Sequence, residues 1–203
     1  WFWYIPLPND TVSVGIVAEK DYLYGGGTRE LGEIFEREVK NNVWIDEHLA
    51  TGMRSDEYRV TGEFSYRSEY CAANGLILTG DAFAFLDPVF SSGLFLALRG
   101  GELAGDAADR ALSTGDFSAA QFAPYGKELC DGLEAMRKLV YAFYDHNFNF
   151  GKLIMAHPDV RPALTDCLIG HLSRDFEALF AGVAEFAKVP ATLAHGRPLV
   201  EAL

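Results

Sequence analysis

The chain has 203 residues with 49% hydrophobic and 13% aromatic content, which is enough apolar surface to bury a substantial core and excludes a disordered protein. Its formal net charge of -12 sets up a negative field that repels nucleic-acid phosphates and anionic membrane surfaces, so neither is an expected partner. No run of about 18 apolar residues is present to span a bilayer, and we expect a cytoplasmic protein.

Residues 1–17 predict a β-hairpin. Residues 1–5 are aromatic and β-prone, Pro8-Asn9-Asp10 is typical of a turn, and residues 11–17 alternate apolar side chains with smaller ones. Because the chain opens inside a structured pattern and without Met, we expect the N-terminus of the protein to lie upstream of Trp1.

A charged helix and a longer strand are expected next. The helix runs from about Arg29 to Asn41 with Thr28 as its N-cap, and its carboxylates are interleaved with arginines as on a solvated face. Residues 59–70 alternate in side-chain character and predict a strand. Asn74-Gly75 then predicts a turn.

Residues 76–93 have the pattern of a ligand-binding segment. The short apolar run 76–79 predicts a buried strand that ends in Gly80-Asp81, and a proline loop then leads to a helix from Ser91 to Leu112. Asp81 could accept hydrogen bonds from polyol hydroxyls, while Pro88 and Gly93 would let backbone amides approach an anion. The alternative is that Gly80-Asp81 only turns the chain and caps a helix.

The C-terminal part is expected to be helical from about 119 to 187, with breaks near 147–151 and 157–158. Its apolar positions recur at three and four residues and predict a packing stripe. The members of this stripe are Leu133, Met136, Leu139, Val140 and Phe143.

Cysteine and histidine spacing predicts no disulfide framework and no metal site. Cys71, Cys130 and Cys167 are far apart and odd in number, so we expect reduced, mostly buried thiols. The five histidines include no pair at helical metal-ligand spacing.

Three motifs give the chain a family resemblance. Leu78-Thr79-Gly80-Asp81-Ala82 resembles the second flavin fingerprint of the FAD-dependent monooxygenase superfamily typified by para-hydroxybenzoate hydroxylase. Residues 85–93 match F-x-x-P-x-x-S-x-G, and residues 1–6 match W-x-W-x-I-P, two patterns associated with flavin-dependent halogenases. The chain is therefore identified as the C-terminal portion of such an enzyme.

The resemblance implies an α+β fold built from an incomplete FAD-binding domain, substrate-domain strands and a helical C-terminal region. The implied division is 1–75 for substrate-domain strands and helix, 76–112 for the second flavin-binding segment, and 113–203 for the helical region. The absence of G-x-G-x-x-G implies that the pyrophosphate site lies upstream of Trp1, together with the catalytic relay lysine. We expect no tight FAD binding by the 203 residues alone.

The resemblance also implies a flavoprotein oxidoreductase. It would use reduced FAD, O2 and chloride or bromide on a small aromatic or carrier-protein-tethered substrate, with a flavin reductase as a partner that supplies reduced FAD. Phe90 replaces the glutamate that precedes the Ser in free-tryptophan halogenases. This departure disfavours tryptophan and favours phenolic, pyrrolic or carrier-tethered substrates.

Site residues carry over from the motifs. The residues expected to bind the cofactor are Gly80, Asp81, Pro88, Ser91, Ser92, Gly93 and Leu94. The backbone amides of Ser92 and Gly93 would hold the halide, because backbone donors offer partial positive charge without a titrating group. Trp1, Trp3 and Pro6 would shield the flavin from the substrate, although two indoles on one strand face are also typical packing anchors.

Two rival functions stay open. One is a geranylgeranyl reductase-like FAD-dependent reductase or dehydrogenase, or a hydroxylating monooxygenase, since related enzymes carry similar Gly-Asp segments. The other is a noncatalytic binding fragment that kept the fold.

Overall fold

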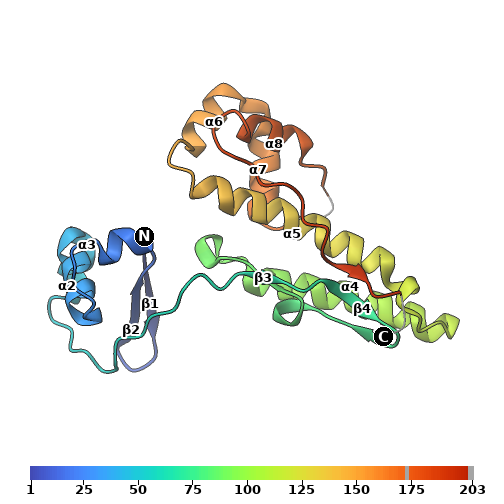
Figure 1. Cartoon of the computed structure of the whole chain (residues 1–203), viewed down its shortest axis with the longest axis horizontal. Helices are drawn as coiled ribbons and strands as arrows, with labels where there is room; N and C mark the ends of the chain where they lie inside the picture. The colour runs from blue at the N-terminus through green and yellow to red at the C-terminus, as the bar shows by residue number, and fades with distance from the viewer. Residues whose placement is uncertain (172–173, 201–203) are drawn as a thin grey trace. The chain divides into compact units, whose positions relative to one another are not determined.

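The structure is a computed structural model that describes residues 1–171 and 174–200. Its contacts divide the chain into two compact units, Trp1–Gly62 and Glu63–Leu203, and each is described by itself (Figure 1). Within the described ranges, no helix combines the length and apolar character needed to cross a membrane.

The first unit opens with the predicted hairpin, which is confirmed. Strand β1 (Phe2–Leu7) pairs antiparallel with β2 (Thr11–Ile16). Three residues, Pro8 to Asp10, connect the paired residues Leu7 and Thr11, and Asn9 and Asp10 both have positive φ, at 61° and 52°, a backbone conformation that Asn and Asp tolerate.

Three helices complete the first unit, namely α1 (Lys20–Tyr24), α2 (Leu31–Asn41) and α3 (Val43–Leu49). Helix α2 confirms the predicted charged helix, but the prediction of Thr28 as its N-cap is wrong, because Glu30 occupies that position. The prediction that the carboxylates of this helix lie on a solvated face fails at one residue. Glu38 is only 5% exposed, since it accepts hydrogen bonds from the Tyr22 hydroxyl at 2.8 Å and from Arg37 Nε at 2.7 Å.

The second unit contains short strands in two sheets. Strand β4 (Tyr70–Ala73) lies between β5 (Leu76–Ile77), which is antiparallel to it, and β7 (Arg197–Pro198), which is parallel. Strand β3 (Tyr66–Arg67) pairs antiparallel with β6 (Ala84–Phe85). The turn predicted at Asn74-Gly75 is confirmed, with Gly75 at φ 69°.

Two strand predictions in this unit are corrected. The strand predicted over 59–70 forms only at its end, because residues 59–65 have no partner strand and Val60 and Phe64 stay 62% and 50% exposed. The buried strand predicted over 76–79 is shorter and lies at a sheet edge, with Leu76 54% exposed.

Helices dominate the rest of the second unit, and they confirm the predicted helical region and its breaks near 147–151 and 157–158, although residues 169–171 and 174–176 form a further break that was not predicted and the last helix ends at Val183. They are α4 (Gly93–Thr114), α5 (Ala123–Phe143), α6 (Phe150–Ala156), α7 (Arg161–Leu168) and α8 (Glu177–Val183). Short 3-10 turns occur at Gly80–Ala82, Pro88–Phe90, Ala119–Phe122 and Pro158–Val160. The mixture of helix and strand confirms the α+β class.

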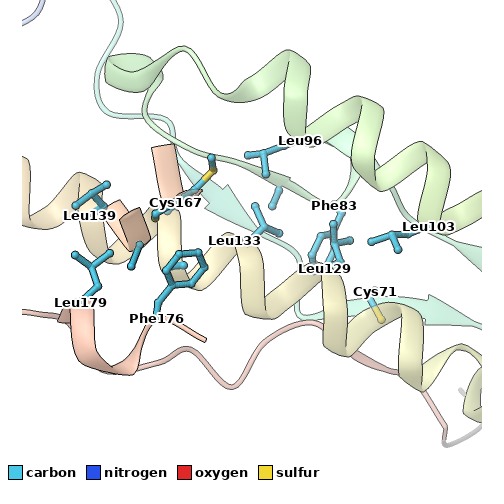
Figure 2. Close-up of a cluster of buried hydrophobic side chains, with 14 of the residues drawn as sticks. Cys71, Phe83, Leu96, Leu103, Leu129, Leu133, Leu139, Cys167, Phe176 and Leu179 are labelled. Carbon is cyan, nitrogen blue, oxygen red and sulfur yellow. The ribbon is translucent and has the colours of Figure 1, made fainter. Parts of the chain in front are cut away.

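The core of this unit forms around α5. The predicted stripe is buried at Leu133, Met136, Leu139 and Val140, whereas Phe143 is 36% exposed near the end of the helix. Figure 2 shows Leu129 and Leu133 of α5 close to Phe83 and Leu96, which come from the segment before and within α4. Cys71 and Cys167 are buried, Cys130 is half-buried and all three are free thiols, as predicted.

Helix α4 has one buried and one exposed apolar face. The buried face contains Leu96, Gly100, Leu103, Ala107 and Ala111. The opposite face carries no charged residue along its centre, and three of its leucines are 67–75% exposed. We call this exposed face, defined by its residues, the α4 stripe: Leu94, Leu98, Gly101, Gly105, Ala108 and Leu112.

Candidate functional site

An open hollow lies where the Gly80–Ala82 turn, β6, the first turns of α4 and the middle of α5 meet. It is open to solvent, and its cavity volume is about 10 Å3. Asp81 and Gly93 both line it, although they lie 12 positions apart in sequence. The other lining residues are Gly80, Phe83, Ala84, Phe85, Leu86, Leu96, Leu129 and Leu133.

The turn that carries Asp81 is fixed by close packing on α4. Gly80 adopts φ 54°, a conformation that disfavours any side chain, and a Cβ there would lie 3.5 Å from Ala97 Cβ. A Cβ at Gly100 of α4 would approach Thr79 Oγ1 to 2.6 Å, so only glycine allows the helix this close. Asp81 itself is exposed, and its backbone carbonyl accepts a hydrogen bond from the Tyr66 hydroxyl.

The loop between β6 and α4 is organised by Asp87. Its Oδ1 accepts hydrogen bonds from the backbone N–H of Val89 and from the Tyr144 hydroxyl, both at 3.0 Å. Pro88 begins the 3-10 turn, where its missing N–H costs nothing. The Ser91 N–H closes the turn by donating to the Pro88 carbonyl at 2.8 Å.

The entry into α4 has the backbone shape of an anion-binding nest. Ser91 is left-handed at φ 52°, ψ 34°, and Ser92 follows as the helix N-cap at φ -82°, ψ -11°. A left-handed residue next to a right-handed one turns successive N–H groups toward one concavity. The first N–H groups of a helix also have no intrahelical acceptor, and they carry the positive end of its dipole. Ser92 and Gly93 therefore offer donors to an anion.

The predicted site residues fall into three sets. Gly80, Asp81 and Gly93 line the hollow together. Pro88, Ser91 and Ser92 lie in the loop that leads to Gly93, and Ser92 is only 7% exposed. Leu94 belongs to the α4 stripe and is 75% exposed.

Sequence reasoning missed several residues at the hollow. Leu129 and Leu133 form its α5 side, and only Leu133 belonged to a predicted stripe, which was read as core packing. Tyr66 was assigned to a strand without a contact to Asp81. No local motif marks such contacts, because they join residues 15 or more positions apart.

The Trp1 and Trp3 motif lies in the first unit and packs within it. The Trp3 ring covers Gly15, its partner across the hairpin, where an added Cβ would lie 1.9 Å from the ring. Its Nε1 donates to Ser13 Oγ at 3.2 Å, and the two indoles meet edge to face at 6.5 Å. Pro6 is exposed opposite Val12. These contacts support the packing account, and shielding stays a prediction.

The Cys71 thiol and the Tyr125 hydroxyl are neutral at ordinary pH. Burial raises the pKa of Cys71 to about 11 and that of Tyr125 to about 12. The Tyr125 hydroxyl donates to the Leu78 carbonyl at 2.5 Å, just before the Asp81 turn. Neither group is a nucleophile in this state. Over the described residues, no three His, Cys, Asp or Glu side chains gather as a metal site would require.

Comparison with known proteins gives a consistent picture. The tryptophan halogenase family model matches residues 1–151. The chain is 27% identical over 150 residues to a 1H-pyrrole-2-carbonyl-[peptidyl-carrier protein] chlorinase of Pseudomonas fluorescens, covering 74% of this chain and 33% of that protein. It is 32% identical over 171 residues to the corresponding brominase of Pseudoalteromonas luteoviolacea, covering 84% and 41%.

A solved structure agrees. The flavin-dependent brominase Bmp2 superposes with a TM-score of 0.73 at 27% identity, over 91% of this chain and 47% of that chain. The chain thus spans less than half the length of each of these proteins.

Proposed function

The chain belongs to the tryptophan halogenase family of flavin-dependent enzymes, and we propose that it forms one wall of the flavin site of an FAD-dependent halogenase. The observation that carries the proposal is the shared hollow, which Asp81 and Gly93 at the start of α4 both line. Bound reduced FAD would supply, with O2, the oxidising power that converts the halide into a halogenating agent.

The residues at the hollow fit a flavin. Asp81 is a carboxylate with acceptor capacity for the hydroxyls of a ribityl chain. An added Cβ at Gly93 meets no atom within 4 Å, so the space beside this residue is left open for a ligand. The N–H groups at the start of α4 suit the electron-rich pyrimidine edge of a reduced flavin.

Halide binding is assigned to the backbone of Ser92 and Gly93. A halide has no directional lone pairs and is held by converging N–H groups, which the left-handed and right-handed sequence at Ser91 and Ser92 supplies. Since a neutral backbone donor does not titrate, we expect halide affinity at this site to be constant across neutral pH.

The proposed substrate is a neutral aromatic ring, free or tethered to a carrier protein. Phe90, directly before the Ser-Ser-Gly loop, meets Phe143 edge to face at 5.6 Å and Phe150 at 6.3 Å. An apolar surrounding of this kind suits a neutral ring better than the ammonium group of an amino acid, which is costly to bury without a partner. A flavin reductase is the proposed partner that supplies reduced FAD.

Product mass tests the reaction. With the full-length enzyme, a flavin reductase, O2 and bromide, we expect bromide-dependent mass gain in a pyrrolyl carrier thioester or a phenol. Absence of brominated and chlorinated product with both kinds of acceptor would reject the halogenase assignment. Consumption of NAD(P)H without the reductase would favour the reductase or dehydrogenase instead.

An Asp81→Asn variant tests the site. Hydrogen bonds to a charged acceptor contribute about 1.5–3 kcal/mol, so FAD affinity should fall by roughly tenfold or more. Asp106→Asn, on an exposed position of α4, removes the same charge away from the hollow and should leave the affinity unchanged. Equal effects of the two variants would contradict the placement of Asp81.

A further inference from the structure

A buried cluster of charges lies in the second unit, and the proposed function does not use it. Glu134 of α5 accepts from Arg67 Nη1 at 2.7 Å and from Arg137 Nη2 at 2.9 Å. The side chains of Arg67 and Glu134 are only 6% and 8% exposed. Buried charges are costly unless each is paired, and the loss of one partner leaves the others uncompensated.

The same arginines hold a C-terminal segment, residues 189–199, which we call the strap. Arg67 Nη2 donates to the carbonyls of Leu193 and His195, both at 2.8 Å. Arg137 Nη2 donates to the carbonyl of Ala191 at 2.6 Å. Two guanidinium groups thus hold the carbonyls of residues 191, 193 and 195, which are alternate residues of the strap. The planar fork of Arg provides this geometry and Lys does not.

The strap also forms backbone hydrogen bonds with strand β4 and with the residue just before it. The Gly196 N–H donates to the Glu69 carbonyl at 2.8 Å, and the Leu199 N–H donates to the Ala72 carbonyl at 2.7 Å. Gly196 has φ 95°, and a Cβ there would lie 2.9 Å from Phe83 Cζ. Phe83 is 1% exposed and lines the hollow, so the strap packs directly on one of its residues.

Arg67 connects the strap to the part of the hollow that carries Asp81. It lies in β3 opposite Ala84 of β6, and the next residue, Ser68, donates its N–H to the Phe83 carbonyl at 2.8 Å. The preceding residue, Tyr66, donates its hydroxyl to the Asp81 carbonyl. Residues 81–85, which we call the Asp81 wall, are therefore backed along their length by residues 66–68.

We propose that the strap fixes the Asp81 wall for flavin binding and that Arg67 is the positioning residue that couples the two. A two-residue strand such as β3 has few ladder hydrogen bonds, so the buried side chain of Arg67 adds to the contacts that hold it in place. Arg67 does not line the hollow, and it acts only through the wall. The inference rests on the proposed flavin site.

Hydrogen exchange of the flavin-free full-length protein tests the coupling. In Arg67→Gln, we expect the amides of residues 82–86 and the hydrogen-bonded strap amides of Leu193, Gly196 and Leu199 to exchange at least tenfold faster, while α7 keeps its protection. Arg99→Gln is the control, because Arg99 of α4 likewise pairs with a carboxylate of α5, with 2.7 Å between its Nη2 and Glu128 Oε1, and belongs to neither wall nor strap. Equal acceleration throughout the second unit, or none at the wall, would overturn the proposal.

FAD titration tests the functional consequence. We expect at least tenfold weaker FAD binding in Arg67→Gln, unchanged binding in Arg99→Gln, and an intermediate value in Arg67→Lys, which keeps the ion pair with Glu134 but loses the fork. Should Arg67→Gln fail to fold, the Arg67→Lys variant carries both measurements. Local loosening with unchanged FAD affinity would overturn the positioning role. If the unmodified protein binds no FAD, the proposed function fails, and hydrogen exchange still decides whether the strap holds the wall.

Discussion

Gly93 has no side chain at the point where the Ser-Ser loop enters α4 and the hollow opens. An added Cβ meets nothing within 4 Å, and the same holds for Gly105 on the exposed stripe of the same helix. Neither glycine has a neighbour that an added methyl group would strike, but only Gly93 lines the hollow. Their alanine variants separate a ligand role from a conformational one.

We expect Gly93→Ala and Gly105→Ala to leave the fold intact and to raise the free energy of unfolding by up to about 1 kcal/mol, because alanine favours the helix. Only Gly93→Ala should lower the rate of halogenation, by roughly 100-fold, since a methyl group in the hollow displaces the ligand from the amides. Urea unfolding and turnover of the full-length enzyme measure the two effects. Equal turnover in both variants would contradict a ligand at Gly93.

Individual site residues were predictable where a motif fixes them. The Gly-Asp and Ser-x-Gly motifs led to Asp81 and Gly93, and the structure brings both to one hollow. Tyr66 and Arg67 carried no such signal, because their contacts reach 15 and 67 residues along the chain. Their roles depend on tertiary packing, which local pattern does not encode.

At the scale of elements, α4 owes its position to Gly100. Gly100 faces Thr79 Oγ1, whereas the adjacent Gly101 faces open space. Gly100→Ala should destabilise the protein by about 1–3 kcal/mol through overpacking, and Gly101→Ala should stabilise it by up to about 1 kcal/mol. Chemical denaturation of the two variants measures the difference. A stabilising Gly100→Ala would show that α4 does not need its close approach to the Asp81 turn.

Helices and the hairpin were predictable because their signals are local. The turn at Asn9 and Asp10 and the three- and four-residue spacing along α5 are contained within each element. The strand predicted over 59–70 failed because a strand needs a partner, and residues 59–65 have none. Strand β7 went unpredicted for the converse reason, since its partner β4 lies more than 120 residues earlier.

At the scale of the whole molecule, the two compact units meet in sequence at Gly62 and Glu63. The functional division proposed from the motifs, at 75 and 112, stays a prediction. The two kinds of boundary need not coincide, because a flavin site is assembled from segments that are distant in sequence.

Alkaline pH should destabilise the protein. Burial raises the pKa of Cys71 from 9.0 to about 11, that of Cys167 from 9.0 to about 12, and that of Tyr125 from 10.0 to about 12. The unfolded chain loses these protons first, so stability is full below pH 9 and falls as pH rises toward 12. Each group contributes a slope of up to about 1.4 kcal/mol per pH unit.

Urea unfolding at intervals from pH 8 to 11 measures this loss. Tyr125→Phe removes one of the three groups, so its stability should fall less steeply above pH 10 than that of the unmodified chain. A free energy of unfolding that stays constant from pH 9 to 11 would contradict the burial of these groups.

The α4 stripe bears on the behaviour of the chain in solution. Leu94, Leu98 and Leu112 leave 67–75% of their surface in water along a helix of 22 residues. Kosmotropic salts such as sulfate strengthen the association of apolar surfaces. We therefore expect precipitants of that kind to bring chains of these 203 residues together along this helix, and mild detergents to keep them apart.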